Sequence, residues 1–440
     1  MAAVDQNMTA DLHPAKIIPR DQHPISRKDI DREALKVLHR LRDAGYSAYL
    51  VGGGVRDIYL GKTPKDFDIS TNARPGQLRK LFRNSRVIGK RFRLVQVFFH
   101  GDKIVEVSTL RCRSEFDIDG ADKVLASNNT YGTVAEDALR RDLTINALFY
   151  EIENLTIIDH VNGVQDLQNK IVRIVGDPAR RIKRDPVRML RAIRHAARSG
   201  FEIETKTWNA IKDNPGYLKM CPDSRIRDEL LKDLTGGASA KWAELALDSG
   251  IFQVLLPFYN KVPTPKTRDL LLANLIVSDR LQNSGVQLSE PFLLALLMLP
   301  WAIEEIDILD DSADRSKKAS FAKSTRAKID HNLKHLNVKK SQKEALTRLL
   351  INLPVFIKLA EEAKWPAWLS RKSYFNDGLL FLRVYQEATG GPSVSSDTIP
   401  PPKPIAAKKK PAPRKRSSAK RGRTPAFTSS KGGVFGLRKR

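Results

Sequence analysis

The hydrophobic pattern of this 440-residue chain changes once, near Gly176, and that change limits the fold more than any other feature. Before it, apolar runs rich in β-branched residues alternate with helical patterns; LVQVFFH at 94–100 and KIVEVSTL at 103–110 are two such runs. From 177 to about 388, apolar residues recur at helical spacing almost throughout. The pattern therefore predicts an α+β part followed by an all-α part.

A glycine turn in the first part lies close to a pair of acids. The residues AYLV at 48–51 predict a strand that runs into GGGVRD at 52–57, and KDFDIS at 65–70 is extended again. Such glycines let backbone N–H groups approach a phosphate, and Asp66 and Asp68, two apart in an extended segment, face one side. Their carboxylates repel each other unless a cation lies between them, and magnesium is the simplest candidate. A structural turn with two solvated acids is the alternative.

Glu106, in the run 103–110, would supply a third carboxylate if its strand lies beside that of Asp68. An exposed strand glutamate is the alternative interpretation.

Two basic clusters follow. In LRRDLTINAL at 139–148 we expect a helical stripe of leucine and alanine, which leaves Arg140, Arg141, Asp142 and Asn146 on the remaining faces. These side chains could contact a triphosphate and ribose, or form an ordinary salt-bridged turn on the surface.

The second cluster, RDPVRMLRAIRHAAR at 184–198, predicts a helix. Asp185, Arg188 and Arg191 lie near one another at helical spacing, and aspartate and arginine can read base edges, although a solvated basic face is the alternative. His195 on this helix has no evident catalytic partner, so we expect a structural role for it.

The chain is strongly basic, with 76 Lys and Arg against 50 Asp and Glu and a formal charge of +26. Residues 401–440 hold 14 of these cations and no acid, so the first 400 carry +12, the total less these 14. Such a chain attracts polyanions, either nucleic acid or an anionic membrane surface, unless the tail is only a solvated extension. PFLLALLMLP from Pro291 is about half the length that spans a bilayer, which favours a buried helix and no membrane span.

The N-terminal segment has no hydrophobic signal core, and its acids argue against a transit peptide. Cys112 and Cys221, the only two cysteines, lack the partner spacing of a zinc site or a disulfide framework. We therefore expect a cytoplasmic protein in a reducing setting.

In combination these motifs resemble those of the class II nucleotidyltransferases of the DNA polymerase β superfamily, which are the bacterial poly(A) polymerases and the CCA-adding enzymes. The resemblance runs from about 26 to 255, with a weaker echo at 371–391. YLVGGGVRDIYLG with PKDFDIST is similar to the phosphate and metal motif of the family, and RRDLTINAL to its second motif. DHVNGVQDL at 159–167 is similar to the turn that joins head to neck, and RDPVRMLRAIR to the nucleotide-selecting helix.

The resemblance implies that Asp66 and Asp68 hold two Mg²⁺ ions, for which Mn²⁺ is a substitute, and the strand pattern adds Glu106 to them as the third member of the catalytic set. It implies that Asp185 and Arg188 read the incoming base. The nucleotide-binding set is then Gly52, Gly53, Arg56, Arg141, Asp142, Asn146, Asp185, Arg188 and Arg191. The family usually has an acid before Asp185 that braces the reading pair, and this chain has Arg184 there.

The resemblance also implies the architecture: a polymerase β-like nucleotidyltransferase head with a mixed sheet and helices, an all-α neck and body, and a disordered basic tail. We expect a flexible N-terminus at 1–28, the catalytic head at 29–176, the neck with its nucleotide-selecting helix and RNA-binding region at 177–260, the body at 261–388 and the tail at 389–440. The polar segments 112–131 and 311–328 are predicted to be loops.

The run VIGKRFRLVQVFF at 87–99 and the basic tail favour a poly(A) polymerase. Such an enzyme adds AMP from ATP to single-stranded RNA 3′ ends without a template, in mRNA polyadenylation and RNA turnover. The alternatives are a tRNA nucleotidyltransferase that adds CCA or only its terminal A, and a non-catalytic RNA-binding protein on the same scaffold. The tail is also a candidate for binding RNA-degradation or RNA-chaperone partners.

Overall fold

The computed structural model describes residues 14–89, 93–112, 131–259, 264–309, 315–362 and 365–394. They belong to one compact unit. The expectations for the loop at 113–130 and for the tail beyond residue 394 therefore concern residues outside the described ranges.

The N-terminal part contains an eight-stranded sheet in the order β1-β8-β7-β2-β3-β6-β5-β4. The strands are β1 (Lys16–Ile18), β2 (Ala48–Val51), β3 (Asp68–Thr71), β4 (Ser85–Ile88), β5 (Leu94–Phe98), β6 (Ile104–Thr109), β7 (Leu148–Glu151) and β8 (Thr156–Asp159). β3 and β6 run parallel, and the other neighbouring strands run antiparallel. The sheet is therefore mixed, as predicted.

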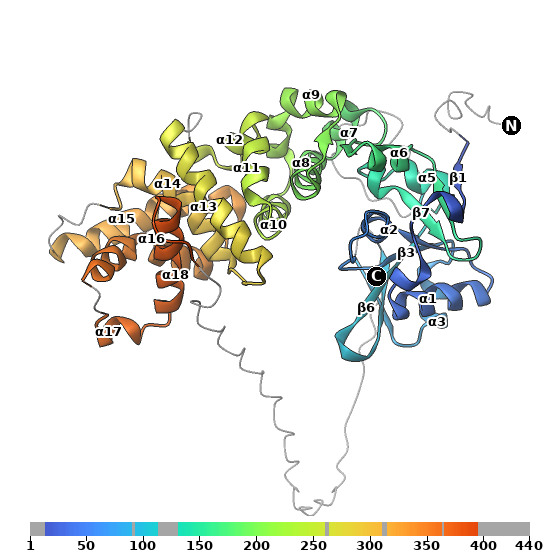
Figure 1. Cartoon of the computed structure of the whole chain (residues 1–440), viewed down its shortest axis with the longest axis horizontal. Coiled ribbons are helices and arrows are strands. Elements are labelled where there is room, and N and C mark those ends of the chain that lie inside the picture. The colour runs from blue at the N-terminus through green and yellow to red at the C-terminus, as the bar shows by residue number, and fades with distance from the viewer. Residues whose placement is uncertain are drawn as a thin grey trace, which may run out of the picture. The chain divides into compact units, whose positions relative to one another are not determined.

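Helices pack against this sheet and complete an α+β head (Figure 1). They are α1 (Arg32–Asp43), α2 (Gly53–Tyr59), α3 (Pro75–Leu81), α5 (Val134–Leu139) and α6 (Gly163–Gln168). Leu38 of α1, Val55 of α2 and Leu78 of α3 are fully buried in one core with Leu50 and Ile69 of the central strands. This burial holds the ends of β2 and β3 in place, and those ends carry the predicted site.

The rest of the described chain is almost entirely helical, which confirms the predicted class (Figure 1). A short parallel pair, β9 (Ile171–Val172) and β10 (Glu202–Ile203), lies where the two parts join. The helices are α7 (Pro178–Arg184), α8 (Val187–Ser199), α9 (Thr205–Asp213), α10 (Asp223–Leu234), α11 (Ser239–Asp248), α12 (Ile251–Leu255), α13 (Pro265–Asn283), α14 (Glu290–Ile306), α15 (Arg315–Asn332), α16 (Lys340–Glu361), α17 (Ala367–Ser370) and α18 (Phe375–Ala388).

The apolar segment from Pro291 lies in α14 and is a buried helix, as predicted. It packs against α13 and α16. No helix in the described residues is both long and apolar enough to cross a membrane.

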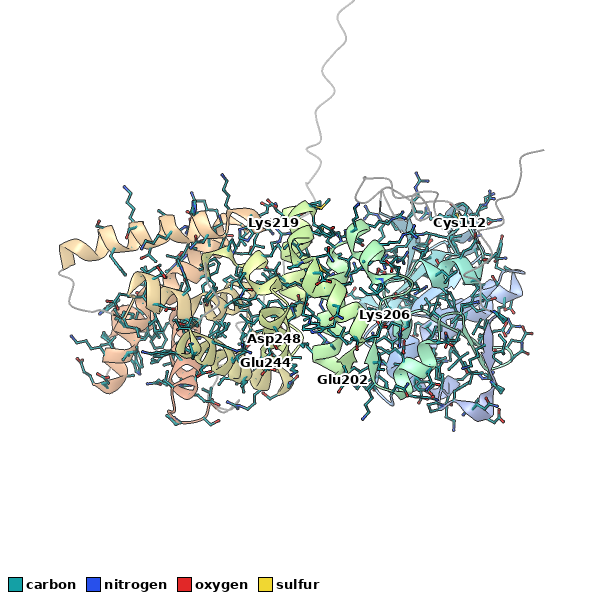
Figure 2. The ribbon with its side chains drawn as sticks, turned by 90° about the horizontal axis from the view of Figure 1, so that it is seen from above. Cys112, Glu202, Lys206, Lys219, Glu244 and Asp248 are labelled. Atoms are coloured by element: carbon teal, nitrogen blue, oxygen red, sulfur yellow. The ribbon has the colours of Figure 1, made fainter. Side chains whose placement is uncertain are left out.

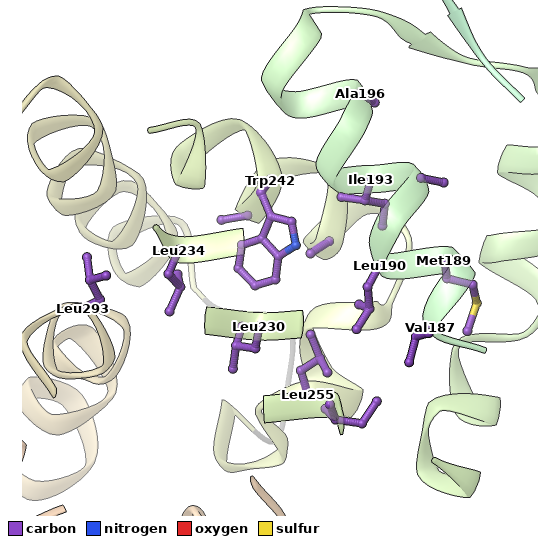
Figure 3. Close-up of a cluster of buried hydrophobic side chains, with 14 of the residues drawn as sticks. Val187, Met189, Leu190, Ile193, Ala196, Leu230, Leu234, Trp242, Leu255 and Leu293 are labelled. Atoms are coloured by element: carbon purple, nitrogen blue, oxygen red, sulfur yellow. The ribbon is translucent and has the colours of Figure 1, made fainter. Parts of the chain in front are cut away.

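Helix α8 is held to α10 and α11 by a second group of apolar side chains. Figure 3 shows Leu190 and Ile193 of α8 beside Leu230 of α10 and Trp242 of α11, all fully buried. Their burial fixes the position of α8, and therefore of the polar residues that α8 presents to the head.

Three local expectations are corrected by the structure. Within the N-terminus expected to be flexible, Lys16–Ile18 form β1, which pairs with β8 and thereby extends the sheet. The segment 311–328 was expected to be a loop, but from Arg315 it belongs to α15, whose Thr325 and Ile329 are fully buried. A polar run can be helical when its residues are good helix formers and a neighbouring helix buries one face, here α16.

The expected helical stripe of 139–148 is also wrong. Helix α5 ends at Leu139, a 3₁₀ turn covers Thr144–Asn146, and β7 begins at Leu148. The backbone N–H of Thr144 donates to Arg173 and that of Val175 donates to Asp142, so distant backbone partners replace helical bonds there.

Candidate active site

The predicted carboxylates lie at the start of β3 and on its parallel neighbour β6. Asp68 is the first residue of β3, and Asp66 lies in the loop immediately before the strand rather than in it. Glu106 is the register partner of Asp68 in the parallel pair, so its strand lies where the prediction required. Gln96 of β5 donates to Glu106 Oε1 over 2.9 Å and orients that side chain. Two of the carboxylates are therefore register partners on adjacent strands, and the third lies in the loop two residues before Asp68.

The environment of Asp68 disfavours the charged form of its carboxylate. The surrounding protein desolvates it even though part of the residue is exposed, and Glu106 and Asp66 add negative charge beside it. These effects raise its pKa to about 6, although Arg141 opposes them. Such crowding is relieved when a cation shares the carboxylate oxygens.

The glycine turn lies against the same carboxylate. Gly52 has φ +68° and precedes α2, and a Cβ added there would lie 3.8 Å from Asp68 Oδ2 and 3.6 Å from Arg141 Nη1. A Cβ added at Gly53 would lie 3.5 Å from Arg56 Nη2. The turn therefore brings bare backbone between two guanidinium groups and next to a carboxylate, which suits an anion that also binds metal.

Arg56, on α2, is held from three sides. Its guanidinium donates to Asp57 Oδ1 over 2.7 and 2.8 Å and to Asn146 Oδ1 over 2.6 Å, and its Nη1 lies 3.3 Å from His195 Nδ1. The predicted residue Asn146 thus contacts a predicted arginine. Sequence reasoning missed Asp57 and His195 as its partners.

Arg141 is fixed by groups that the sequence did not single out. Its guanidinium donates to Asp137 Oδ2 over 3.0 Å and to Ser70 Oγ over 3.2 Å, and lies over the ring of Phe149. The side chain of Asp137 is only 1% exposed. Burial alone would raise the pKa of Asp137, but the guanidinium groups of Arg141 and Arg140 lower it, so Asp137 remains charged.

Asp142 links the head to α8. Arg188 Nη1 lies 2.8 Å from Asp142 Oδ1, and Arg191 Nη1 donates to Asp142 Oδ2. Although burial would raise the pKa of Asp142, Arg188 and Arg191 hold it well below its usual value. Arg188 also donates to the backbone carbonyl of Arg141 over 3.0 Å. These three predicted residues are therefore brought together, as a bridge between the two parts of the chain.

Asp185 is placed apart from that bridge. Both of its carboxylate oxygens pair with Arg225 of α10, at 2.8 and 2.9 Å. Arg188 directs its side chain to Asp142 instead, although its backbone N–H donates to the carbonyl of Asp185 over 3.1 Å. Arg225 therefore takes a bracing position beside Asp185, and no sequence signal points to it because it lies 40 residues away.

The donor set fits magnesium. Asp66, Asp68 and Glu106 offer the hard carboxylate oxygens that this ion prefers. In the described part of the chain, no three His, Cys, Asp or Glu side chains lie so as to hold a metal by themselves. That is compatible with magnesium, which is commonly bound by one or two carboxylates together with waters and substrate phosphates. The site therefore fits an ion that the protein and a phosphate-bearing ligand hold jointly.

Two protein-family models match the chain. A model described as the poly A polymerase head domain matches residues 48–173, which include the glycine turn, the carboxylates and Arg141. A model described as the probable RNA and SrmB-binding site of polymerase A matches residues 200–262.

Curated relatives carry two names. Poly(A) polymerase I of Escherichia coli O6:H1 is 47% identical over 248 residues, which cover 55% of this chain and 53% of that protein. Poly(A) polymerase I of Haemophilus influenzae is 36% identical over 317 residues, 70% of each chain. The CCA-adding enzyme of Lactobacillus helveticus is 39% identical over 234 residues, 53% of this chain and 57% of that protein. The match thus spans about half the length of several of these relatives.

Solved structures with a similar fold include CCA-adding enzymes. That of Bacillus stearothermophilus in complex with CTP has a TM-score of 0.61 and 25% identity, and the match covers 82% of this chain and 79% of that one. That of Thermotoga maritima complexed with tRNA has a TM-score of 0.58 over 85% and 84% of the two chains. Its identity of 18% supports the fold alone.

Proposed function

Because the chain belongs to the nucleotidyltransferase family of bacterial poly(A) polymerases and CCA-adding enzymes, we propose that it adds AMP from ATP to RNA 3′ ends without a template. The observation that carries this proposal is the meeting of Asp68 and Glu106 in register, beside a glycine turn that Arg56 and Arg141 flank. Poly(A) addition is preferred because the poly(A) polymerases match at higher identity, 47% against 39%.

The triphosphate would lie along the Gly52–Gly53 turn. Arg56 and Arg141 donate only, and each is already oriented by a carboxylate, so little side-chain freedom is lost when they bind phosphate oxygens. Asp66 and Asp68 would hold two Mg²⁺, which when bound would lower the pKa of the RNA 3′-hydroxyl and neutralise the departing pyrophosphate. Glu106 adds negative charge that favours cations at this edge.

Base choice falls to the protein, since no template takes part. Asp185 would accept from the exocyclic amine of adenine, and Arg225 would keep the carboxylate oriented for it. Arg188, fixed by Asp142 and the carbonyl of Arg141, would stand beside the nucleotide rather than move freely. Arg225 thus orients Asp185 in a chain that has Arg184 where the family usually has an acid.

The test is incorporation of each NTP, separately, onto a single-stranded oligoribonucleotide and onto a tRNA that lacks CCA. We expect long tails with ATP alone. Asp68→Ala or Asp66→Ala should lose more than about 1,000-fold in rate, because several kcal/mol of charge stabilisation disappear at roughly 1.4 kcal/mol per tenfold. Asp213→Ala, at an exposed carboxylate of α9, is the matched control.

The outcomes separate the candidates. Addition that stops after one to three nucleotides on the tRNA indicates the tRNA nucleotidyltransferase, which the CCA-adding enzymes among the solved structures favour. RNA binding without incorporation of any NTP indicates a non-catalytic RNA-binding protein. Residual activity of Asp68→Ala within tenfold of the unaltered chain would refute the carboxylate site.

A further inference from the structure

His195 of α8 lies in contact with the predicted triphosphate site, although its own helix belongs to the other part of the chain. Its Nδ1 lies 3.3 Å from Arg56 Nη1, and its Nε2 lies 3.3 Å from Asn146 Nδ2. Asn146 also accepts from Arg56 through its side-chain oxygen and from Arg141 through its backbone carbonyl. Asn146 therefore joins the two arginines of the glycine turn, and the ring of His195 adds a contact to Arg56 from α8.

The donors in this network determine the state of the ring. A guanidinium has no acceptor, so His195 Nδ1 must be unprotonated to bond Arg56. The Asn146 amide cannot be turned over to serve the ring, because its oxygen is needed by Arg56 at 2.6 Å. A neutral imidazole has one acceptor nitrogen, and the charged donor is the stronger partner. Nδ1 therefore accepts from Arg56, and Nε2 carries the hydrogen, so Nε2 and the Asn146 amide nitrogen are both donors and form no hydrogen bond with each other.

We propose that His195 is a positioning residue for nucleotide binding, whose unprotonated Nδ1 holds the Arg56 guanidinium over the Gly52–Gly53 turn to meet the β- and γ-phosphates of ATP. This inference rests on the proposed function, because it takes the turn as the triphosphate site. Without the ring, Arg56 keeps Asp57 and Asn146 but loses the contact that comes from α8.

The surroundings keep the ring neutral. Burial, and then the positive charges of Arg56, Arg194 and Arg198, lower the pKa of His195 well below its usual value. The charged groups that face this region are Arg56 of α2, Asp142 of the head, Arg194 and Arg198 of α8, and Glu229 and Asp233 of α10, which pair with Arg194. Protonation would turn Nδ1 into a donor and place a positive charge against Arg56, so the lowered pKa keeps the acceptor available throughout the neutral range.

Two near-isosteric variants isolate the acceptor. His195→Asn places a side-chain oxygen where the ring has Nδ1, whereas His195→Leu has the same shape without an acceptor. The dissociation constants of ATP and AMP are measured by calorimetry on the full chain with Mg²⁺, and the KM for ATP is measured alongside. His39→Leu, at an exposed position of α1, is the control.

We expect His195→Leu to weaken ATP binding about tenfold, as for loss of one bond to a charged donor, and to raise the KM for ATP more than it lowers kcat. AMP binding should change less than about twofold, since AMP lacks the β- and γ-phosphates, and His195→Asn should restore ATP binding to within about threefold. Thermal unfolding checks each variant, and His195→Phe replaces His195→Leu if the latter does not fold.

Equal weakening of ATP and AMP would indicate a general structural role and overturn the inference, as would ATP binding by His195→Leu within twofold of the unaltered chain. Incorporation by the unaltered chain distinguishes this result from failure of the proposed function. If the unaltered chain binds ATP but extends no RNA, the proposed function is refuted, while the comparison of ATP with AMP still decides the role of His195.

Discussion

Asp68 favours the proposed function but lowers the stability of the folded chain. Its carboxylate lies beside Glu106 and Asp66, which suits cation binding but costs the folded chain free energy when no cation is bound. The pKa of about 6 in the folded chain lies above the ordinary aspartate value of 3.8, so the folded state binds more protons than the unfolded state between these values. The free energy of unfolding therefore falls as pH rises from about 4 to 6, and it stays lower above pH 6.

We therefore expect Asp68→Asn to be inactive but to melt higher than the unaltered chain in EDTA at pH 7.5. The increase should be about 1–2 °C, a small value because solvent screens a partly exposed group. The difference should shrink at pH 5, and added Mg²⁺ with ATP should raise the melting temperature only of the unaltered chain. Differential scanning calorimetry measures these temperatures.

Glu202→Gln is the control for this experiment, because Glu202 is an exposed carboxylate of β10, far in sequence from Asp68 (Figure 2). A melting temperature of Asp68→Asn at or below that of the unaltered chain, in EDTA at pH 7.5, would contradict the electrostatic account.

At the scale of elements, α8 depends on a buried charged cluster as well as on apolar packing. Arg194 of α8 lies 2.6 Å from Glu229 Oε2 of α10 and also bonds Asp233, whose side chain is fully buried. Burial raises the pKa of Asp233 to about 7, and Arg194 opposes that rise. The guanidinium of Arg194 thus offsets the cost of burying two carboxylates between α8 and α10.

Removing that cation should destabilise the chain strongly. We expect Arg194→Met to lower the free energy of unfolding by about 3–5 kcal/mol, because two acids lose their partner inside the protein. Urea unfolding followed by circular dichroism measures the change, with Lys206→Met, an exposed position of α9, as the control (Figure 2).

The double variant Arg194→Met with Asp233→Asn should recover part of the loss, since one acid no longer needs compensation. Strictly additive losses in the double variant would show that the pair does not interact energetically.

At the scale of the whole molecule, charge determines how the chain meets RNA. The tail at 401–440 carries 14 cations and no acid, and a single strand loses about 0.7 in the logarithmic salt slope for each phosphate contact. If the tail engages roughly six phosphates, deleting 400–440 should flatten the slope of log affinity against log salt by about 4.

Filter binding to a single-stranded oligoribonucleotide, at salt concentrations from about 50 to about 200 mM, measures that slope. A tail of the same length with its Lys and Arg replaced by Gln separates charge from length. An unchanged slope after deletion would show that the tail makes no RNA contact.

Some of this architecture follows from local sequence. The mixed sheet was implied by the family resemblance. Within it, apolar β-branched runs predicted the strands that became β5 and β6, and the long apolar run predicted the buried helix α14. These strands and this helix follow from residue periodicity, which acts over a few positions. The helix α15 was missed because a partner elsewhere in the chain, α16, buries one of its faces.

The contacts that refine the site were decided by tertiary structure. Arg56 meets His195 across 139 positions of sequence, Asp185 meets Arg225 across 40, and Asp142 bridges to α8. The residue types determine which groups donate and which accept, but a guanidinium or a carboxylate can pair equally well with many partners. Which partner it finds depends on where apolar packing places α8 and α10 against the head, and no local pattern encodes that placement.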